Sequence, residues 1–255
     1  MSGETAYLNS LLEKYRITDS MRNRIIGKRQ LIENRLKSVY GSKITTIMYS
    51  GSYGKDTAVS LDYDLDLIVY FRHDSFTTLY EMYQSVYSTL SSSSFGPVRR
   101  QKVSIGIDLG LFHIDVVPAR LLDDSGTRDG NLYNSTDGSS IKTNIKTHID
   151  YVTKAKCKPV IRIMKLWKKE NDLPIKSFAL ELITIRALDG QPENDLYSQY
   201  CRAMTYIVSN IETVRLIDPA NSNNDLASGM SWMDRSVVKN SAARAMAYDI
   251  RRIIS

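Results

Sequence analysis

The stretch LDYDLDLIVYF, residues 61–71, constrains the fold more than any other part of the sequence. Aspartates occupy every second position, at Asp62, Asp64 and Asp66, and an unbroken apolar run follows them. Side chains alternate along a strand, so the pattern predicts a buried strand whose first residues carry three carboxylates on one face. Carboxylates this close raise one another's pKa unless water solvates them or a cation lies between them. The stretch therefore indicates either an exposed strand end or a site for a divalent cation such as Mg²⁺, which prefers oxygen ligands.

The first half of the chain mixes helical and strand patterns. Residues 4–40 are helical in pattern, with Asp19 and Ser20 as candidate caps of a second, long helix that ends at Gly41. The apolar positions expected to face the core of that helix are Met21, Ile25, Ile32, Leu36 and Val39. The elements predicted after Gly41 are strands at 43–50 and 65–71, a helix at about 76–90, and strands at 98–108 and 111–117. The last two strands are expected to form a hairpin that turns at 108–110, and Pro118 is expected to close the second.

The second half of the chain has a different character. Residues 122–144 are rich in Asp, Ser, Gly and Asn, which predicts a long surface loop or a connection between lobes. Beyond this loop the patterns are helical only, at roughly 145–155, 158–171, 175–188, 195–213 and 231–254. We therefore predict an α/β (α+β) fold, with a core over residues 1–140 and a helical lobe over residues 141–255.

Composition limits the classes of protein that the chain can belong to. The 255 residues are 42% hydrophobic and 24% charged, which is typical of one large or two small globular domains. No apolar run approaches the roughly 18–20 residues of a membrane helix, and the start lacks a secretory signal, so we expect a cytoplasmic protein without a membrane partner. Cys157 and Cys201 lie far apart with no CxxC motif, which argues against a disulfide framework or a zinc site. The formal charge of +6 favours anionic partners without distinguishing nucleotides from nucleic acid.

Other residues strengthen the cation interpretation of the aspartates. Gly51 and Ser52 end one predicted strand and open a loop of small residues, where backbone N–H groups and a hydroxyl can approach phosphate oxygens. Asp115 lies in another predicted strand, which could pack beside the first and supply a further carboxylate. Lys165 and Ser177 in the helical half offer one point charge and one hydroxyl at a helix start, which suit a triphosphate.

Several of these motifs, taken in order, resemble a known superfamily. Gly51-Ser52, then Asp64-Leu65-Asp66, then Asp115 in the IDVVP strand resemble the DNA polymerase beta-type nucleotidyltransferases. The further motifs GSYGKDTAV, KLW, SFALEL and IDPANSNNDLA are similar to the branch that contains oligoadenylate synthetases, cyclic GMP-AMP synthase and the bacterial CD-NTases. The bacterial members resemble the chain most, over nearly its whole length.

The resemblance implies a fold and a set of site residues. It implies a nucleotidyltransferase core with a mixed sheet and a C-terminal helical lobe, with the active site in the cleft between them. Asp64, Asp66 and Asp115 match the ligands of two Mg²⁺ ions, with Mn²⁺ as a possible substitute, and Asp62 falls outside the motif. A general-base role for Asp115 is the alternative. The other positions that match the family motif are Gly51 and Ser52 for the donor phosphates, Lys165 and Ser177 for the donor triphosphate, and Asp218 for the base pocket. The loop departs from the family at Tyr63 and at Asp56, which stands where glycine is frequent.

The activity implied by the resemblance is synthesis of a second messenger. The chain would join NTPs, such as ATP or GTP, into a cyclic di- or trinucleotide and release pyrophosphate, in antiphage signalling of the CBASS type. A separate effector protein would bind the product, and nucleic acid is neither required nor ruled out as a partner. Two alternatives stay open: a template-independent RNA nucleotidyltransferase or linear oligoadenylate synthetase, and a nucleotide sensor that has lost its chemistry.

Overall fold

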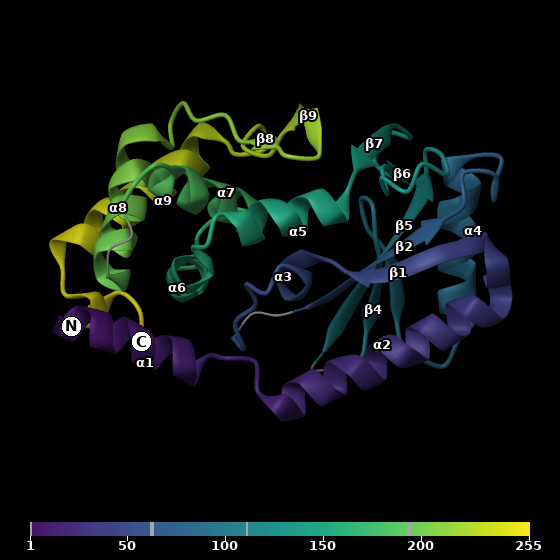
Figure 1. Ribbon diagram of the computed structural model, residues 1–255, viewed down its shortest axis with the longest axis horizontal. Helices are drawn as coiled ribbons and strands as arrows, with labels where there is room; N and C mark the ends of the chain where they lie inside the picture. Colours follow the sequence, from purple (N-terminus) through teal and green to yellow (C-terminus); the bar gives the residue numbers. More distant parts are fainter. Residues whose placement is uncertain (1, 62–63, 111, 193–194) are drawn as a thin grey trace. The chain divides into compact units, whose positions relative to one another are not determined.

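The computed structural model describes residues 2–61, 64–110, 112–192 and 195–255 (Figure 1). These residues form two compact units. The sheet unit contains the described residues of 18–55 and 63–149, and the helical unit contains those of 1–17, 56–62 and 150–255. The sequence predicts two consecutive segments, 1–140 and 141–255, whereas each of these units combines separate parts of the chain. The assignment of catalysis to the first segment and of nucleotide binding to the second stays a prediction.

A mixed sheet is the framework of the sheet unit. Its strands are β1 (Ile44–Tyr49), β2 (Leu65–Phe71), β3 (Val98–Arg100), β4 (Ile105–Asp108), β5 (His113–Leu121), β6 (Gly130–Tyr133) and β7 (Ser140–Thr143). Five of them lie in the order β1-β2-β5-β4-β3, while β6 pairs with β5 and β7. Only the pairing of β2 with β5 is parallel among the described strands. The aspartate-bearing strand and the IDVVP strand are thus immediate neighbours.

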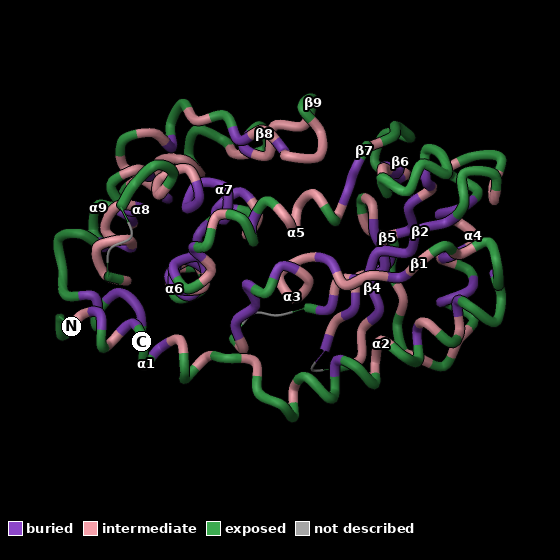
Figure 2. The backbone as a smooth tube through the Cα atoms, viewed as in Figure 1, coloured by how far each residue is buried: buried purple, intermediate pink, exposed green. Residues whose placement is uncertain are grey.

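Two helices pack on this sheet. They are α2 (Asp19–Tyr40) and α4 (Leu79–Ser91). Helix α4 contacts β5 and β6, and α2 contacts α4 and β1. Strand β2 is buried on both faces from Leu67 to Phe71 (Figure 2), and the face that carries Tyr70 packs in a cluster with Leu132 of β6. Tyr40, at the end of α2, packs edge-to-face against Phe71 with ring centroids 5.2 Å apart.

The helical unit is a bundle with one small hairpin. Its elements are α1 (Gly3–Lys14), α6 (Lys158–Glu170), α7 (Ser177–Leu188), α8 (Leu196–Asn210), β8 (Ile217–Asp218), β9 (Asn221–Asp225) and α9 (Trp232–Ala247). Helix α5 (Ile145–Lys154) begins in the sheet unit and ends in this one. The core of the bundle includes Trp167 of α6, Leu8 and Leu11 of α1, and Val59 from the segment that precedes β2. No helix among the described residues combines the length and the apolarity needed to cross a bilayer.

Several boundaries predicted from the sequence were wrong. Thr18, not Asp19 or Ser20, caps α2: its Oγ1 accepts a hydrogen bond from the Met21 N–H at 3.3 Å. Gly41 does end that helix, with a φ of 51°. Val39 is exposed and Tyr40 takes its place in the core.

The strand predictions also need correction. The stretch 98–108 is two short antiparallel strands, β3 and β4, and not one. Pro118 lies inside β5, between the residues that pair with β4 and those that pair with β6, where its missing N–H interrupts neither antiparallel ladder. The expected loop 122–144 contains β6 and β7, and the second half is not purely helical, because β8 and β9 form a hairpin.

Candidate active site

The centre of the candidate site is a pair of aspartates on neighbouring strands. Asp66 of β2 lies directly opposite Asp115 of β5 in the parallel register. Side chains at paired positions of parallel strands project to the same face of the sheet, so the two carboxylates share one surface. The residue paired with Asp115 on its other side is Gly106 of β4, which carries no side chain. Both aspartates are half-buried.

The surroundings of Asp115 disfavour its ionised form. Burial raises the pKa of Asp115, and the nearby charge of Asp64 raises it further, whereas a hydrogen bond from the Gln101 side chain lowers it. Its Oδ1 atom is buried and has no hydrogen-bond partner among the described residues. A buried carboxylate oxygen without a donor is a group that a cation would stabilise.

Asp64 is the third predicted ligand, and it stands apart from the pair. It precedes β2 and is exposed. Its charge nonetheless reaches Asp115, as the pKa of Asp115 reflects. As the side chains lie here, no three His, Cys, Asp or Glu residues in the described ranges are gathered closely enough to hold a metal ion. Asp62 and Tyr63 lie outside the described residues.

Gly51 brings the predicted phosphate loop against Asp66. The Ser50 N–H donates to the Asp66 carbonyl at 2.8 Å, and the chain then turns through Gly51 with a φ of 56°. A Cβ atom at this position would lie 1.7 Å from Oδ2 of Asp66, so only glycine leaves room for the carboxylate. Ser52 follows in the single turn α3 (Gly51–Gly54). The sequence-predicted Gly51, Ser52 and Asp66 are therefore brought together.

The helical unit holds the other three predicted residues. Lys165 is only 6% exposed; its Nζ lies 2.5 Å from Oε1 of Glu181 and donates to Oγ1 of Thr57 at 2.8 Å. Ser177 begins α7, and its Oγ accepts from Nζ of Lys168 at 3.1 Å.

Asp218 has a structural set of partners. It is buried in β8, where its Oδ1 accepts from the Ala220 N–H at 2.8 Å and its Oδ2 from Nδ2 of Asn224 at 3.0 Å. Both bonds lie within the β8–β9 hairpin, so Asp218 shapes that turn.

Sequence reasoning missed Glu181 and Thr57. Thr57 also donates to Oε1 of Glu181, at 2.8 Å, so the hydroxyl, the carboxylate and the Lys165 ammonium form one buried network. The sequence does carry a signal for this pair, because Lys165 in IMKLW and Glu181 in FALELI are single charges flanked by apolar residues. Opposite charges that are buried in this way usually pair.

Asp56 anchors the same segment to α6. Its Oδ1 lies 2.8 Å from Nη2 of Arg162, and its Oδ2 lies 3.4 Å from Nζ of Lys158. Its φ is 57°, the left-handed region that glycine prefers, at the position where the resembling family frequently has glycine. Within the helical unit, residues 56–61 are thus held by ion pairs, by the Thr57 network and by the burial of Val59.

Comparison with known proteins shows the family and the fold of the chain. The family model described as Second Messenger Oligonucleotide or Dinucleotide Synthetase domain (SMODS) matches residues 1–155. The cyclic AMP-AMP-AMP synthase of Escherichia coli (strain MS 115-1) is 28% identical over 220 residues, which cover 70% of this chain and 67% of that protein.

Solved structures share the fold over almost the whole chain. CdnC of E. coli MS115-1 with ATP is similar with a TM-score of 0.75 and 20% identity, over 95% of this chain and 90% of that one. The cyclic AMP-GMP synthase DncV of Vibrio cholerae, with a linear intermediate, is similar with a TM-score of 0.80 and 15% identity, over 96% and 92%. These likenesses confirm the predicted fold class. Because the family model matches more than half of the 255 residues, the chain belongs to the SMODS family and is a nucleotidyltransferase that synthesises an oligonucleotide or dinucleotide second messenger.

Proposed function

We propose that the chain joins nucleoside triphosphates into a cyclic oligonucleotide, releases pyrophosphate, and holds two Mg²⁺ ions with Asp64, Asp66 and Asp115. The observation that carries the proposal is the pairing of Asp66 with Asp115 on adjacent parallel strands, with Gly51 packed against Asp66. Mn²⁺ would substitute, since it also accepts carboxylate oxygens.

The residues present fit divalent cations. All three are hard oxygen donors, and Oδ1 of Asp115 is buried without a hydrogen-bond partner among the described residues. Asp64 lies exposed ahead of β2, where a change of rotamer leaves the core undisturbed, so we infer that it completes the ligand set when an ion binds. Bound ions would lower the pKa of the attacking ribose hydroxyl and neutralise charge on the triphosphate.

The protein itself mainly positions the reactants. Gly51 allows the backbone to approach the donor phosphates, and the Ser52 hydroxyl would donate to them. Asp115, whose pKa is raised, is also suited to accept the proton of the hydroxyl if it acts as a general base.

We assign supporting roles to three residues of the helical unit. Lys165 and Ser177 would contact the donor triphosphate. Phosphate oxygens would then replace part of the ion pair of Lys165 with Glu181 and of the hydrogen bond that Ser177 accepts from Lys168. Asp218 would act on the base pocket through the hairpin that it holds in shape.

ATP is the first substrate to test. The relative named cyclic AMP-AMP-AMP synthase and the CdnC structure with ATP both support an adenine nucleotide. We place the product in antiphage signalling, where a separate effector protein would bind it.

A labelling experiment distinguishes this function from its alternatives. The purified chain is incubated with each α-labelled NTP and Mg²⁺ or Mn²⁺, and the products are treated with phosphatase. Small phosphatase-resistant products support cyclisation. Phosphatase-sensitive short oligomers would support a linear synthetase, extension of added RNA would support a polymerase, and bound but unchanged nucleotide would support a sensor.

A variant tests the assignment of the ligands. The double variant Asp64→Asn/Asp66→Asn should lose all detectable product while keeping its circular dichroism spectrum, because amides are poor ligands for Mg²⁺. If this variant turned over normally, the aspartates would not be the metal ligands.

A further inference from the structure

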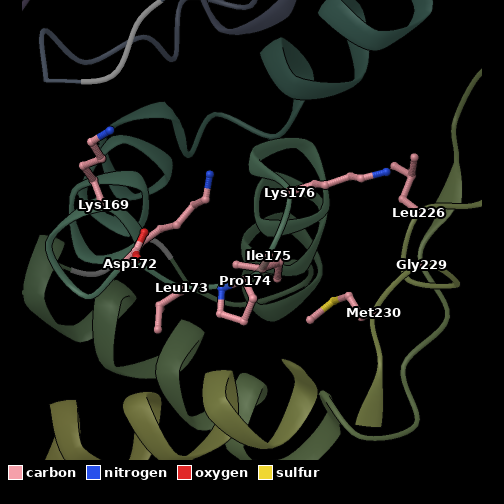
Figure 3. Close-up of a pocket in the computed structure, with 10 residues that line it drawn as sticks. Lys169, Asp172, Leu173, Pro174, Ile175, Lys176, Leu226, Gly229 and Met230 are labelled. Atoms are coloured by element: carbon pink, nitrogen blue, oxygen red, sulfur yellow. The ribbon is translucent and has the colours of Figure 1, made fainter. Parts of the chain in front are cut away.

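A pocket in the helical unit is lined by none of the residues proposed to bind the metal ions or the donor nucleotide. It has a volume of about 450 Å³ and lies where the end of α6, the connection to α7 and the stretch after β9 meet (Figure 3). Its apolar wall includes Leu173, Ile175 and Met230, and Figure 3 shows Met230 extending toward Ile175. A volume of this size suits one small ligand.

Lysines give the pocket its charge. Lys168, Lys169 and Lys176 line it, together with Asp172. In Figure 3 the Lys176 side chain runs across to Leu226, whereas Asp172 lies on the side of Lys169. Among the lining residues that the structure describes, three basic side chains stand against one acidic side chain.

Lys168 and Lys176 lack the neutralising partners of the other lysines discussed above. In the described part of the chain, no carboxylate forms an ion pair with either of them, in contrast to Lys165 and Lys158. Lys168 instead donates to Ser177, at the start of α7, where the first turn carries no acidic residue. Lys176 immediately precedes α7, and a cation is disfavoured at the positive end of a helix dipole, so this lysine would gain from a bound anion.

We propose that this pocket is a second nucleotide site, which binds the phosphates of a nucleoside phosphate with Lys168 and Lys176 and its base against the wall of Ile175 and Met230. Lysine ammonium groups are effective point charges for phosphate, and an apolar wall accepts the face of a planar base. The volume fits a single nucleotide unit rather than a longer oligomer. The site uses none of the three catalytic aspartates, so the proposal does not depend on the assignment of those aspartates as metal ligands.

Calorimetric titration tests the proposal. The Asp64→Asn/Asp66→Asn protein is titrated with ATP, pyrophosphate and adenosine in the presence of EDTA, so that neither turnover nor metal-dependent binding contributes. We expect ATP to bind more tightly than pyrophosphate or adenosine, because only ATP uses both the lysines and the apolar wall. Binding of ATP to the donor residues is distinguished by Met230→Ser, which removes no contact proposed for the donor nucleotide.

Two variants separate the two halves of the site. Lys176→Glu should weaken binding of both ATP and pyrophosphate about tenfold or more, because it removes a charged phosphate contact. Met230→Ser should weaken ATP binding about fivefold and leave pyrophosphate binding unchanged, because it removes apolar contact only. Lys176→Arg should retain binding.

Lys102→Glu is the matched control, since Lys102 is an exposed lysine of the sheet unit. It changes the net charge by the same amount as Lys176→Glu and should leave both affinities unchanged. The proposal is overturned if ATP does not bind in EDTA, if Lys176→Glu binds as the parent does, or if Lys102→Glu weakens binding equally.

Discussion

At Gly51 a single missing methyl group leaves room for the Asp66 carboxylate. We predict that Gly51→Ala lowers the rate of product formation about 100-fold or more, since displacement of a reacting group by about 1 Å has effects of this size. The added Cβ would lie 1.7 Å from Oδ2 of Asp66, and the φ of 56° adds backbone strain. The rate is measured as pyrophosphate release.

Gly27→Ala is the control for this substitution. Gly27 lies in α2, and a Cβ atom added there would meet nothing within 4 Å, so the variant should keep full activity and gain up to about 1 kcal/mol of helix stability. Full activity of Gly51→Ala would mean that Asp66 can move aside without consequence.

The ionised carboxylate of Asp115 should lower the stability of the folded protein. Because the pKa of this carboxyl is raised in the folded state, the folded protein holds the proton more tightly than the unfolded chain does. The free energy of unfolding therefore falls as the pH rises from 3.8, the ordinary pKa of an aspartate, through the raised pKa of Asp115. We predict that Asp115→Asn, measured in EDTA, has a higher Tm than the parent at pH 7, and that the difference shrinks as pH approaches 3.8 from above. A lower Tm at pH 7 would show instead that the ionised carboxylate stabilises the fold, through the bond from Gln101.

At the scale of elements, the network of Lys165, Glu181 and Thr57 links α6, α7 and the segment that precedes β2. Glu181 is 1% exposed and Lys165 is 6% exposed, so removing one charge leaves the other buried without its counter-ion. We predict that Glu181→Gln lowers the free energy of unfolding by about 3–5 kcal/mol, measured by urea denaturation. The double variant Glu181→Gln/Lys165→Met should recover much of the loss.

An exposed ion pair of similar geometry is the control for this prediction. Lys239 and Glu212 approach to 2.6 Å on the surface, so Glu212→Gln should change stability by no more than about 1 kcal/mol. If Glu181→Gln and Glu212→Gln lost equal stability, burial would have no special role in the effect.

The same network affects tests of substrate affinity. Lys165→Ala alone would remove a triphosphate contact and also leave Glu181 without its counter-ion, so the double variant Glu181→Gln/Lys165→Met is the better test.

The elements show which parts of the structure the sequence could predict. The strand at 65–71 and the helices of the second half follow from apolar periodicity, and the structure has them within a few residues, except that the helix predicted to end at residue 254 ends at Ala247. Strands β6 and β7 were missed because Ser, Gly and Asp dominate their surroundings. The pairing of β6 with β5 and of β7 with β6 outweighs that local preference.

The candidate site was predictable by residue type but not by geometry. Asp66 meets Asp115 because β2 and β5 pair in parallel, and such pairing joins segments far apart in the sequence that no periodicity relates. The burial of Lys165 against Glu181 depends likewise on how α6 packs on α7, which the sequence of either helix alone does not specify.

At the scale of the whole molecule, the chain passes from one unit to the other near residues 17, 55, 62 and 149. The core of the helical unit consequently draws on three separate parts of the sequence. Leu8, Leu11 and Val59 are at most 3% exposed within it. Helix α1 is also fastened there by hydrogen bonds from Thr5 to Asp195, at 2.5 Å, and from the Tyr7 hydroxyl to the Ile254 carbonyl, at 2.8 Å.

This interleaving predicts that residues 141–255 do not fold when expressed alone. Burial of Leu8, Leu11 and Val59 contributes roughly 1.5–3 kcal/mol each, which together is comparable with the whole stability of a domain, about 5–15 kcal/mol. The fragment should therefore show poorly dispersed amide signals in NMR spectra and no cooperative thermal transition. Joining residues 1–17 to it through a flexible linker should restore much of the dispersion, because α1 then regains its contacts with α6 and α8. A cooperative transition of the unlinked fragment would instead show that α6 to α9 form a sufficient core, and that α1 and Val59 only cover it.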